Sequence, residues 1–187
     1  MDEFIHLKNY KNIKNYLNKK RFAKCQRIQL NWIFLTDNNL LFYDNRSLAT
    51  RFPEREKRAR GKKKGGEQGV KSILRGNIET DVYDVHILNI NLTGCDGFGN
   101  IKNIKKISTD ISDFNYYYIN HYYSKSTEEF ITKLIRGSAV HGLGNNYKLL
   151  RIKVYFALND ITKEKIDFIE KETGLNLTKF RKKIKNV

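Results

Sequence analysis

The segment from residue 116 to residue 137 constrains the fold more than any other part of the chain. It runs from three consecutive tyrosines through His121 to a serine that precedes an apolar helical pattern. Ser126 and Glu129 have the spacing of a capping box, and Gly137 is a typical helix end. The sequence therefore predicts an aromatic strand that leads directly into a capped helix, with a histidine at the junction.

Periodic patterns elsewhere predict interleaved helices and strands. Tyr10, Ile13 and Leu17 have helical spacing, whereas the apolar residues from Ile28 to Phe34 alternate with polar ones. The alternation predicts a half-buried strand, and the interleaving predicts a mixed α/β protein. The predicted elements are helices over 9–19, 161–172 and 176–185, and strands over 28–34, 70–74, 82–88 and about 149–158.

Length and composition limit the class of protein. A chain of 187 residues forms one domain, or one domain with a small appendage. No stretch is apolar enough to be a transmembrane segment, and no signal peptide is visible, so we expect a cytoplasmic protein. Cys25 and Cys95 fit no metal-binding spacing. We therefore expect both to be reduced, buried thiols.

The charge of the chain favours an anionic partner. There are 36 Lys and Arg against 20 Asp and Glu, a net charge of +16. Such an excess is typical of proteins that bind nucleic acid, anionic membranes or phosphorylated substrates. The chain is also rich in Lys, Asn, Ile and Tyr together, which a strongly AT-biased coding sequence would produce. A small basic nucleic-acid-binding protein, using the basic run at 51–64 of a loop predicted over 51–68 and the basic C-terminal helices, is one hypothesis.

The junction between the predicted strand and helix offers groups for chemistry. His121 suits a metal such as Mn²⁺ or Zn²⁺, or proton transfer, but it would also suit a simple hydrogen bond to a backbone carbonyl. Lys125 stands beside a helix start, where backbone N–H groups favour phosphate. Alternatively, Ser126 only caps the helix and Lys125 is a solvated charge.

Several short motifs occur in an order that resembles a known enzyme family. They include Asp2-Glu3-Phe4-Ile5, Asn31-Trp32, Lys71-Ser72-Ile73 and the segment from His121-Tyr122 through Lys125-Ser126 to Glu129-Phe130. This order resembles the second half of the family 92-type glycosyltransferases and the related family 2-like enzymes. Those enzymes have a GT-A fold, and the similarity covers about residues 2–137.

The resemblance implies roles for particular residues. Asp2 takes the place of the second aspartate of the metal motif, with Glu3 beside it, and His121 completes the shell of Mn²⁺ or another divalent metal. Lys125 and Ser126 would bind the donor diphosphate. Trp32 would form the acceptor-side wall. The residue that acts as the catalytic base is not assigned.

The implied function is metal-dependent transfer of a sugar to an acceptor hydroxyl, a hexosyltransferase type of reaction. The expected donor is a nucleotide-sugar, a UDP-sugar in particular, and the acceptor is a glycan, a lipid or a protein. Residues 1–145 would be the C-terminal portion of the GT-A-like domain, and 146–187 a strand with a basic helical tail.

The N-terminal nucleotide-binding half of the GT-A fold has no counterpart in the sequence. The first aspartate of the metal motif would precede Met1. We therefore expect a fragment that is weakly active or inactive alone, and a second chain that supplies the other half is an expected partner.

Overall fold

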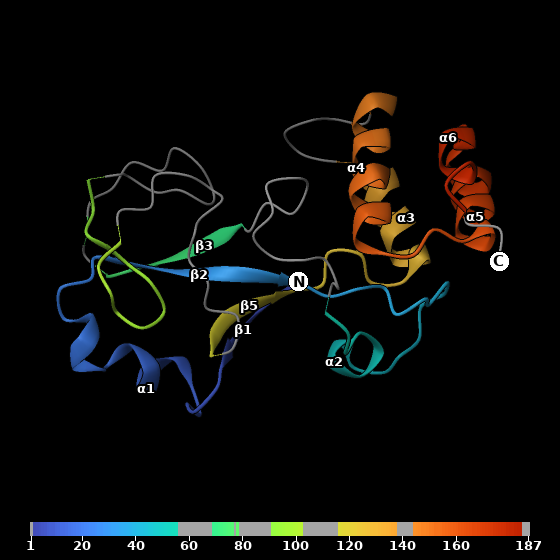
Figure 1. The fold of residues 1–187 in the computed structure, drawn as a ribbon. Helices are drawn as coiled ribbons and strands as arrows, with labels where there is room; N and C mark the ends of the chain where they lie inside the picture. The colour runs from blue at the N-terminus through green and yellow to red at the C-terminus, as the bar shows by residue number, and fades with distance from the viewer. Residues whose placement is uncertain are drawn as a thin grey trace. The chain divides into compact units, whose positions relative to one another are not determined.

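The computed structural model describes residues 2–55, 69–76, 78, 91–102, 116–137 and 144–184. The chain forms two compact units (Figure 1). We call Met1–Ile33 with Lys57–His121 the sheet unit, and Phe34–Glu56 with Tyr122–Val187 the helical unit. The boundary expected at residue 145 falls inside the helical unit.

The sheet unit contains a mixed sheet, as expected for an α/β class protein. Its strands follow the order β1-β5-β2-β3, and β4 pairs separately with β2. The β1–β5 and β2–β3 pairs are antiparallel, whereas β4 is parallel to β2. The strands are β1 (Glu3–Leu7), β2 (Arg27–Phe34), β3 (Val70–Leu74), β4 (Gly94–Cys95) and β5 (Tyr117–His121).

The core of the sheet unit lies between the sheet and two short helical segments. Helix α1 (Ile13–Leu17) and the 3₁₀ turn η1 (Lys20–Phe22) run along one face of the sheet (Figure 1). The helix predicted over 9–19 is shorter because Asn12 caps its start. The buried side chains of this core include Tyr16, Phe22, Ile28, Leu30, Tyr117 and Ile119.

Strand β2 is buried on both faces, so the prediction of a half-buried strand is wrong. Arg27 and Gln29 are 0% exposed and Asn31 is 1% exposed, although they alternate with the apolar residues of the core. Alternation tells which residues share a face, but not whether the polar face meets water. Burial lowers the pKa of the Arg27 guanidinium.

The two cysteines form a disulfide, which corrects the expectation of reduced thiols. Cys25 precedes β2, and Cys95 lies opposite Ile28 in the parallel pairing of β4 with β2. The Cα atoms are 5.7 Å apart although the residues are 70 positions apart in the sequence. Disulfides persist mainly in oxidising compartments, so this bond does not favour the expected cytoplasmic location. Within the described ranges, no helix has the length and apolar character needed to cross a membrane.

The helical unit confirms the predicted helix at the junction. Ser126 accepts a hydrogen bond from the backbone of Glu129, whose side chain reaches back to Ser126, and Gly137 ends the helix. The helices of this unit are α2 (Leu48–Arg51), α3 (Thr127–Arg136), α4 (Asn145–Leu158), α5 (Lys163–Thr173) and α6 (Thr178–Arg181). Helices α5 and α6 confirm the two predicted C-terminal helices, with shorter bounds.

The strand predicted at about 149–158 is wrong, because this segment is helix α4. Leu150 to Val154 alternate in polarity, which fits a strand. However, Ile152, Tyr155 and Phe156 are buried together in the core of the helical unit, at helical spacing. Packing against α3, α5 and α6 therefore selects the helical period. The strand predicted over 82–88, and residues 56–68 of the predicted loop, lie outside the described residues.

Candidate metal centre

Three potential metal ligands meet where β1 pairs with β5. Glu3 lies directly opposite His121 in the antiparallel register, so their side chains share one face of the sheet, and Asp2 immediately precedes β1. His121 Nε2 lies 3.8 Å from Glu3 Oε1 and 3.9 Å from Asp2 Oδ2. One ligand atom from each residue lies within 4.8 Å of the other two.

The distances in this triad suit a shared cation. They exceed the length of a hydrogen bond. Two ligand atoms that each bind one ion at about 2.1 Å would lie roughly 3 to 4.2 Å apart. The His121 side chain is 9% exposed, whereas those of Asp2 and Glu3 are 34% and 28% exposed. An ion could therefore reach the carboxylates from solvent and meet a fixed imidazole beneath them.

The triad is bordered by an aromatic ring and a cation. The ring centroids of Trp32 and His121 are 4.9 Å apart. Lys71 Nζ lies 3.6 Å from Glu3 Oε2 and 5.4 Å from the Trp32 ring centroid. Lys71 is on β3, opposite Leu30 of β2, so the strand register brings it to the same face as Trp32.

Gly69 allows the Trp32 indole to take this position. A Cβ atom at Gly69 would lie 2.0 Å from Trp32 Cε3, which no real contact permits. The backbone N–H of Trp32 also donates to the Gly69 carbonyl oxygen at 2.9 Å. The absence of a side chain at residue 69 therefore helps to set the border of the metal centre.

The structure brings together some of the residues singled out from the sequence. Asp2, His121 and Trp32 meet in the sheet unit, whereas Lys125 and Ser126 belong to the helical unit. Sequence reasoning named Glu3 only as the neighbour of Asp2, and it assigned no role to Lys71 at the metal. Both depend on strand pairing, and an assumed antiparallel pairing of the first strand with the strand ending at His121 would have found Glu3.

The first backbone N–H groups of helix α3 already donate hydrogen bonds within the chain. Thr127 N donates to the Leu40 carbonyl at 3.0 Å, and Glu128 N donates to the Leu41 carbonyl at 2.9 Å. Glu129 N donates to Ser126 Oγ at 3.2 Å. The N–H groups that the sequence offered to a diphosphate thus already have partners in this structure.

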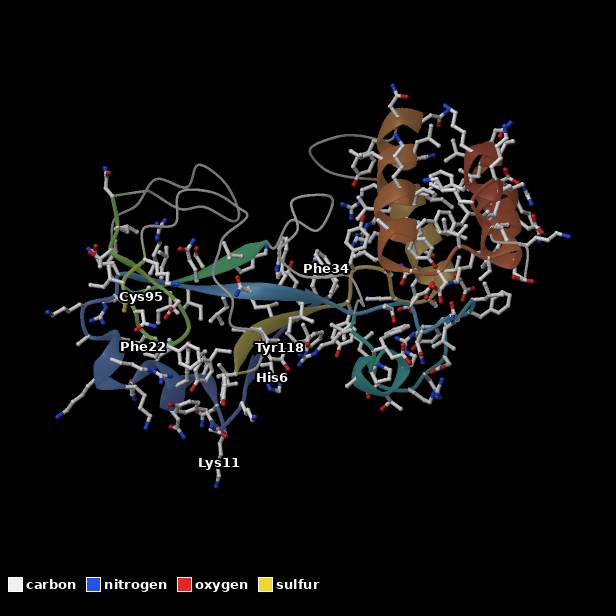
Figure 2. The ribbon with its side chains drawn as sticks, viewed as in Figure 1. His6, Lys11, Phe22, Phe34, Cys95 and Tyr118 are labelled. Carbon is white, nitrogen blue, oxygen red and sulfur yellow. A yellow bond between two sulfur atoms is a disulfide. The ribbon has the colours of Figure 1, made fainter. Side chains whose placement is uncertain are left out.

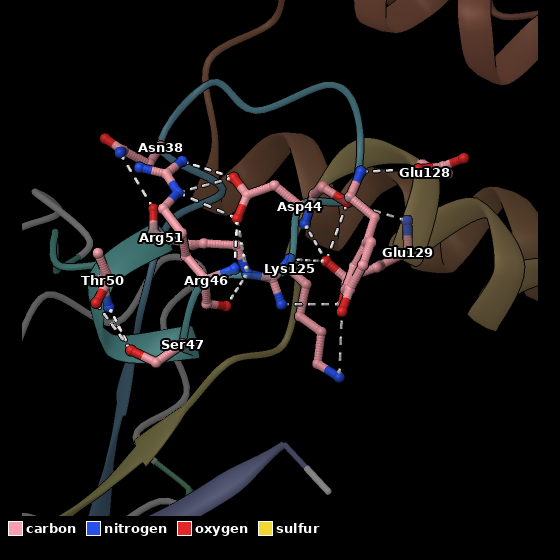
Figure 3. Close-up of polar contacts among 11 residues, drawn as sticks. Asn38, Asp44, Arg46, Ser47, Thr50, Arg51, Lys125, Glu128 and Glu129 are labelled. Atoms are coloured by element: carbon pink, nitrogen blue, oxygen red, sulfur yellow. Dashed lines mark hydrogen bonds and ion pairs between the residues drawn. The ribbon is translucent and has the colours of Figure 1, made fainter.

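Lys125 lies in a network of charged side chains at this helix start (Figure 3). Its Nζ is 4.0 Å from Glu129 Oε1, and its backbone has the left-handed φ of +53°, which is uncommon for a residue with a side chain. Arg51, whose side chain is 4% exposed, donates to Glu129 Oε2 at 2.7 Å. Burial raises the pKa of Glu129, but the hydrogen bonds from Arg51 and Ser126 outweigh it, so this pKa is lowered overall.

Comparison with other proteins assigns neither a family nor a function to the chain. No protein-family model matches the chain, and no curated protein or solved structure is significantly similar to it. The function proposed below therefore rests on the geometry of the site and on the resemblance of the sequence motifs.

Proposed function

We propose that Asp2, Glu3 and His121 bind a divalent metal ion, and that the centre serves the transfer of a sugar from a nucleotide-sugar donor. The metal triad is the single observation that carries this proposal. Two carboxylates and an imidazole converge at ligand distances, on residues from two strands that are distant in the sequence. The order of sequence motifs supplies the reaction class by resemblance.

The donor set suits several divalent ions, including Zn²⁺, Fe²⁺ and Mn²⁺, and the resemblance selects Mn²⁺ among them. Carboxylate oxygens suit Mg²⁺, Ca²⁺ and Mn²⁺, whereas imidazole nitrogen suits Zn²⁺, Cu²⁺, Fe²⁺ and Ni²⁺. Manganese accepts both donor types, and it is the ion that the resemblance implies. The residues of the triad therefore fit the proposed metal.

The bound ion would stabilise negative charge on the departing nucleoside diphosphate. In this proposal Asp2 and Glu3 supply two negative charges and His121 a neutral donor. Lys71 lies within 3.6 Å of Glu3 and adds a positive charge beside the triad. We assign the cation on the diphosphate side to Lys71 instead of Lys125, because Lys71 shares the sheet unit with the metal ligands.

Trp32 would supply an apolar wall for a sugar ring. Its indole borders His121 and is held by the close approach of Gly69. Aromatic faces pack well against the C–H face of a sugar, and the resemblance places this residue on the acceptor side. The proposed donor is a UDP-sugar, and the proposed acceptor is a hydroxyl of a glycan, lipid or protein.

The nucleic-acid hypothesis receives less support from the described residues. Arg51, which begins the predicted basic loop, is buried against Glu129. Lys165, in a C-terminal helix predicted to be basic, is buried against Asp37. Both cations hold the helical unit together, so neither is available to a phosphate backbone.

Mn²⁺ titration monitored by tryptophan fluorescence tests the proposal, because Trp32 is the one tryptophan of the chain. Mn²⁺ should change its emission in the wild-type protein, and both Glu3→Gln and His121→Ala should weaken Mn²⁺ binding at least about tenfold. UDP-sugar binding should then depend on added Mn²⁺.

His6→Ala is the matched control for this titration. His6 is on β1 as Glu3 is, but alternation places it on the opposite face of the sheet. There its ring stacks on that of Tyr118, with the ring centroids 4.3 Å apart (Figure 2). This variant should bind Mn²⁺ as the wild type does. If Mn²⁺ leaves the wild-type emission unchanged and calorimetry detects no binding, the metal centre does not exist. If Mn²⁺ binds but UDP-sugars do not, the metal assignment stands and the reaction class is wrong.

A further inference from the structure

A second site of the sheet unit is a pocket of about 280 Å³ at the end of the sheet where β2 begins and β3 ends. Its walls are about equally polar and apolar, and the antiparallel pairing of Ile28 with Ile73 places two apolar side chains next to each other. None of its lining residues belongs to the metal triad. The lining residues are Leu17, Asn18, Phe22, Cys25, Gln26, Ile28, Ile73, Leu74, Arg75 and Gly76.

The frame of this pocket is rigidly connected. Arg75 Nη2 donates to the carbonyl oxygens of Phe22 and Ala23 at 2.9 and 3.2 Å, and Arg75 Nε donates to that of Cys25 at 3.2 Å. The backbone N–H of Arg75 donates to Gln26 O at 2.9 Å, and the disulfide ties Cys25 to β4. These bonds join β3 to the segment before β2, so the pocket is formed before any ligand arrives.

The charge of the pocket comes from Arg75 alone. No acidic residue lines it, and no ion pair of Arg75 occurs among the described residues. Nη1 takes part in none of the three side-chain bonds, so its N–H groups remain for a ligand. A guanidinium that is held in place by three carbonyl oxygens keeps its full charge and loses little entropy when it binds an anion.

We propose that this pocket binds a small organic carboxylate with an apolar tail. The tail would lie against Leu17, Phe22 and Ile73, and the carboxylate would accept hydrogen bonds from Arg75 Nη1. The volume lies at the lower end of the usual range for ligand pockets, about 300–1,000 Å³, and therefore suits a small ligand. The proposal is independent of the metal centre, since it concerns other residues and requires no metal.

Calorimetric titration of the full chain with octanoate and with 1-octanol tests the proposal. Octanoate should bind the wild-type protein more tightly than 1-octanol, which has the same tail without the charge. Arg75→Gln should weaken octanoate at least tenfold and leave 1-octanol unchanged. Arg75→Lys, which keeps the charge, should lose less octanoate affinity than Arg75→Gln.

A second pair of variants tests the apolar walls without touching Arg75. Ile73→Phe enlarges a lining side chain and should weaken both ligands, whereas Ile5→Phe makes the same change at an exposed position of β1 and should weaken neither. Thermal unfolding confirms that each variant is folded. The proposal is overturned if octanoate fails to bind the wild type, or if folded Arg75→Gln or Ile73→Phe binds it with wild-type affinity. If Arg75→Gln does not fold, the octanoate and octanol affinities of Ile73→Phe decide.

Discussion

Asp37 of the helical unit and the two carboxylates of the metal centre are surrounded in opposite ways. Asp37 Oδ2 accepts a hydrogen bond from Tyr155 Oη at 2.6 Å and forms an ion pair with Lys165 Nζ at 2.7 Å. Its Oδ1 accepts from the backbone N–H of Asn39 at 3.0 Å. The side chains of Asp37 and Lys165 are 2% and 1% exposed. This carboxylate is closed off from solvent and fully bonded within the chain.

The candidate metal centre is more open to solvent. Its carboxylates are about one-third exposed, and they stand 3.8 and 3.9 Å from the imidazole nitrogen. Burying a charge is tolerable only when direct hydrogen bonds compensate it, as they do around Asp37. The buried carboxylate of Asp37 thus holds the helical unit together, whereas the partly exposed carboxylates of the sheet unit are those of the proposed metal centre.

Breaking the Asp37 cluster should have the largest effect on stability. Lys165→Met leaves Asp37 as an uncompensated buried charge and should lower the free energy of unfolding by about 3–5 kcal/mol. Urea denaturation measures this loss. Lys163→Met, on the exposed side of the same helix, is the matched control and should change stability by less than about 0.5 kcal/mol. Equal effects of the two variants would show that the cluster is not a structural element.

Removal of the disulfide should separate stability from metal binding in the sheet unit. Replacing Cys25 and Cys95 by alanine opens a loop closed over 70 positions and should cost roughly 2–4 kcal/mol of unfolding free energy. Cys25 is distant from Trp32 along β2, so Mn²⁺ affinity should stay within about twofold of the wild type. Denaturation and Mn²⁺ titration of the same preparation measure both quantities. A large loss of Mn²⁺ affinity would mean that the centre depends on the far end of the sheet.

Mn²⁺ should stabilise the wild-type protein more than Glu3→Gln, because the variant binds the ion at least about tenfold more weakly. At a free concentration one hundred times its dissociation constant, the ion adds about 2.7 kcal/mol to the unfolding free energy. Without metal, Glu3→Gln should be as stable as the wild type or slightly more stable, because it removes one of two neighbouring negative charges. Thermal unfolding with Mn²⁺ and with EDTA measures the difference. If Glu3→Gln is much less stable than the wild type in EDTA, Glu3 has a structural role, as Asp37 has.

The smallest expected effect concerns pH and the network at the start of α3. The pKa of Glu129 is lowered in the folded state, because the hydrogen bonds of Arg51 and Ser126 outweigh burial. Its contribution to stability is therefore complete above the ordinary glutamate pKa and is lost as the pH falls through the folded value. The stability of Glu129→Gln should fall less steeply than that of the wild type below about pH 4.3. Parallel denaturation curves for both proteins across this range would contradict the assignment.

Some elements could be predicted from the sequence and others could not, for physical reasons. Sequence reasoning found β3 with its observed bounds and the capping box of α3, because neighbouring residues decide both. It failed at α4, whose alternating polarity fits a strand as well as a helix until the core around Ile152 selects the period. It also offered the backbone N–H groups at the start of α3 as one possible phosphate site, whereas those of Thr127 and Glu128 donate to the carbonyls of Leu40 and Leu41.

The sequence by itself determined the mixed α/β class, the strand that ends at His121 and the helix that Ser126 begins, because backbone preferences and side-chain periodicity act over a few residues. Only the tertiary structure decided which distant residues meet. Strand register places Glu3 opposite His121, a parallel pair brings Cys95 to Cys25, and helix packing buries Lys165 against Asp37. Such contacts depend on pairing and packing of the whole chain, which no local pattern specifies. The candidate metal centre is of this second kind.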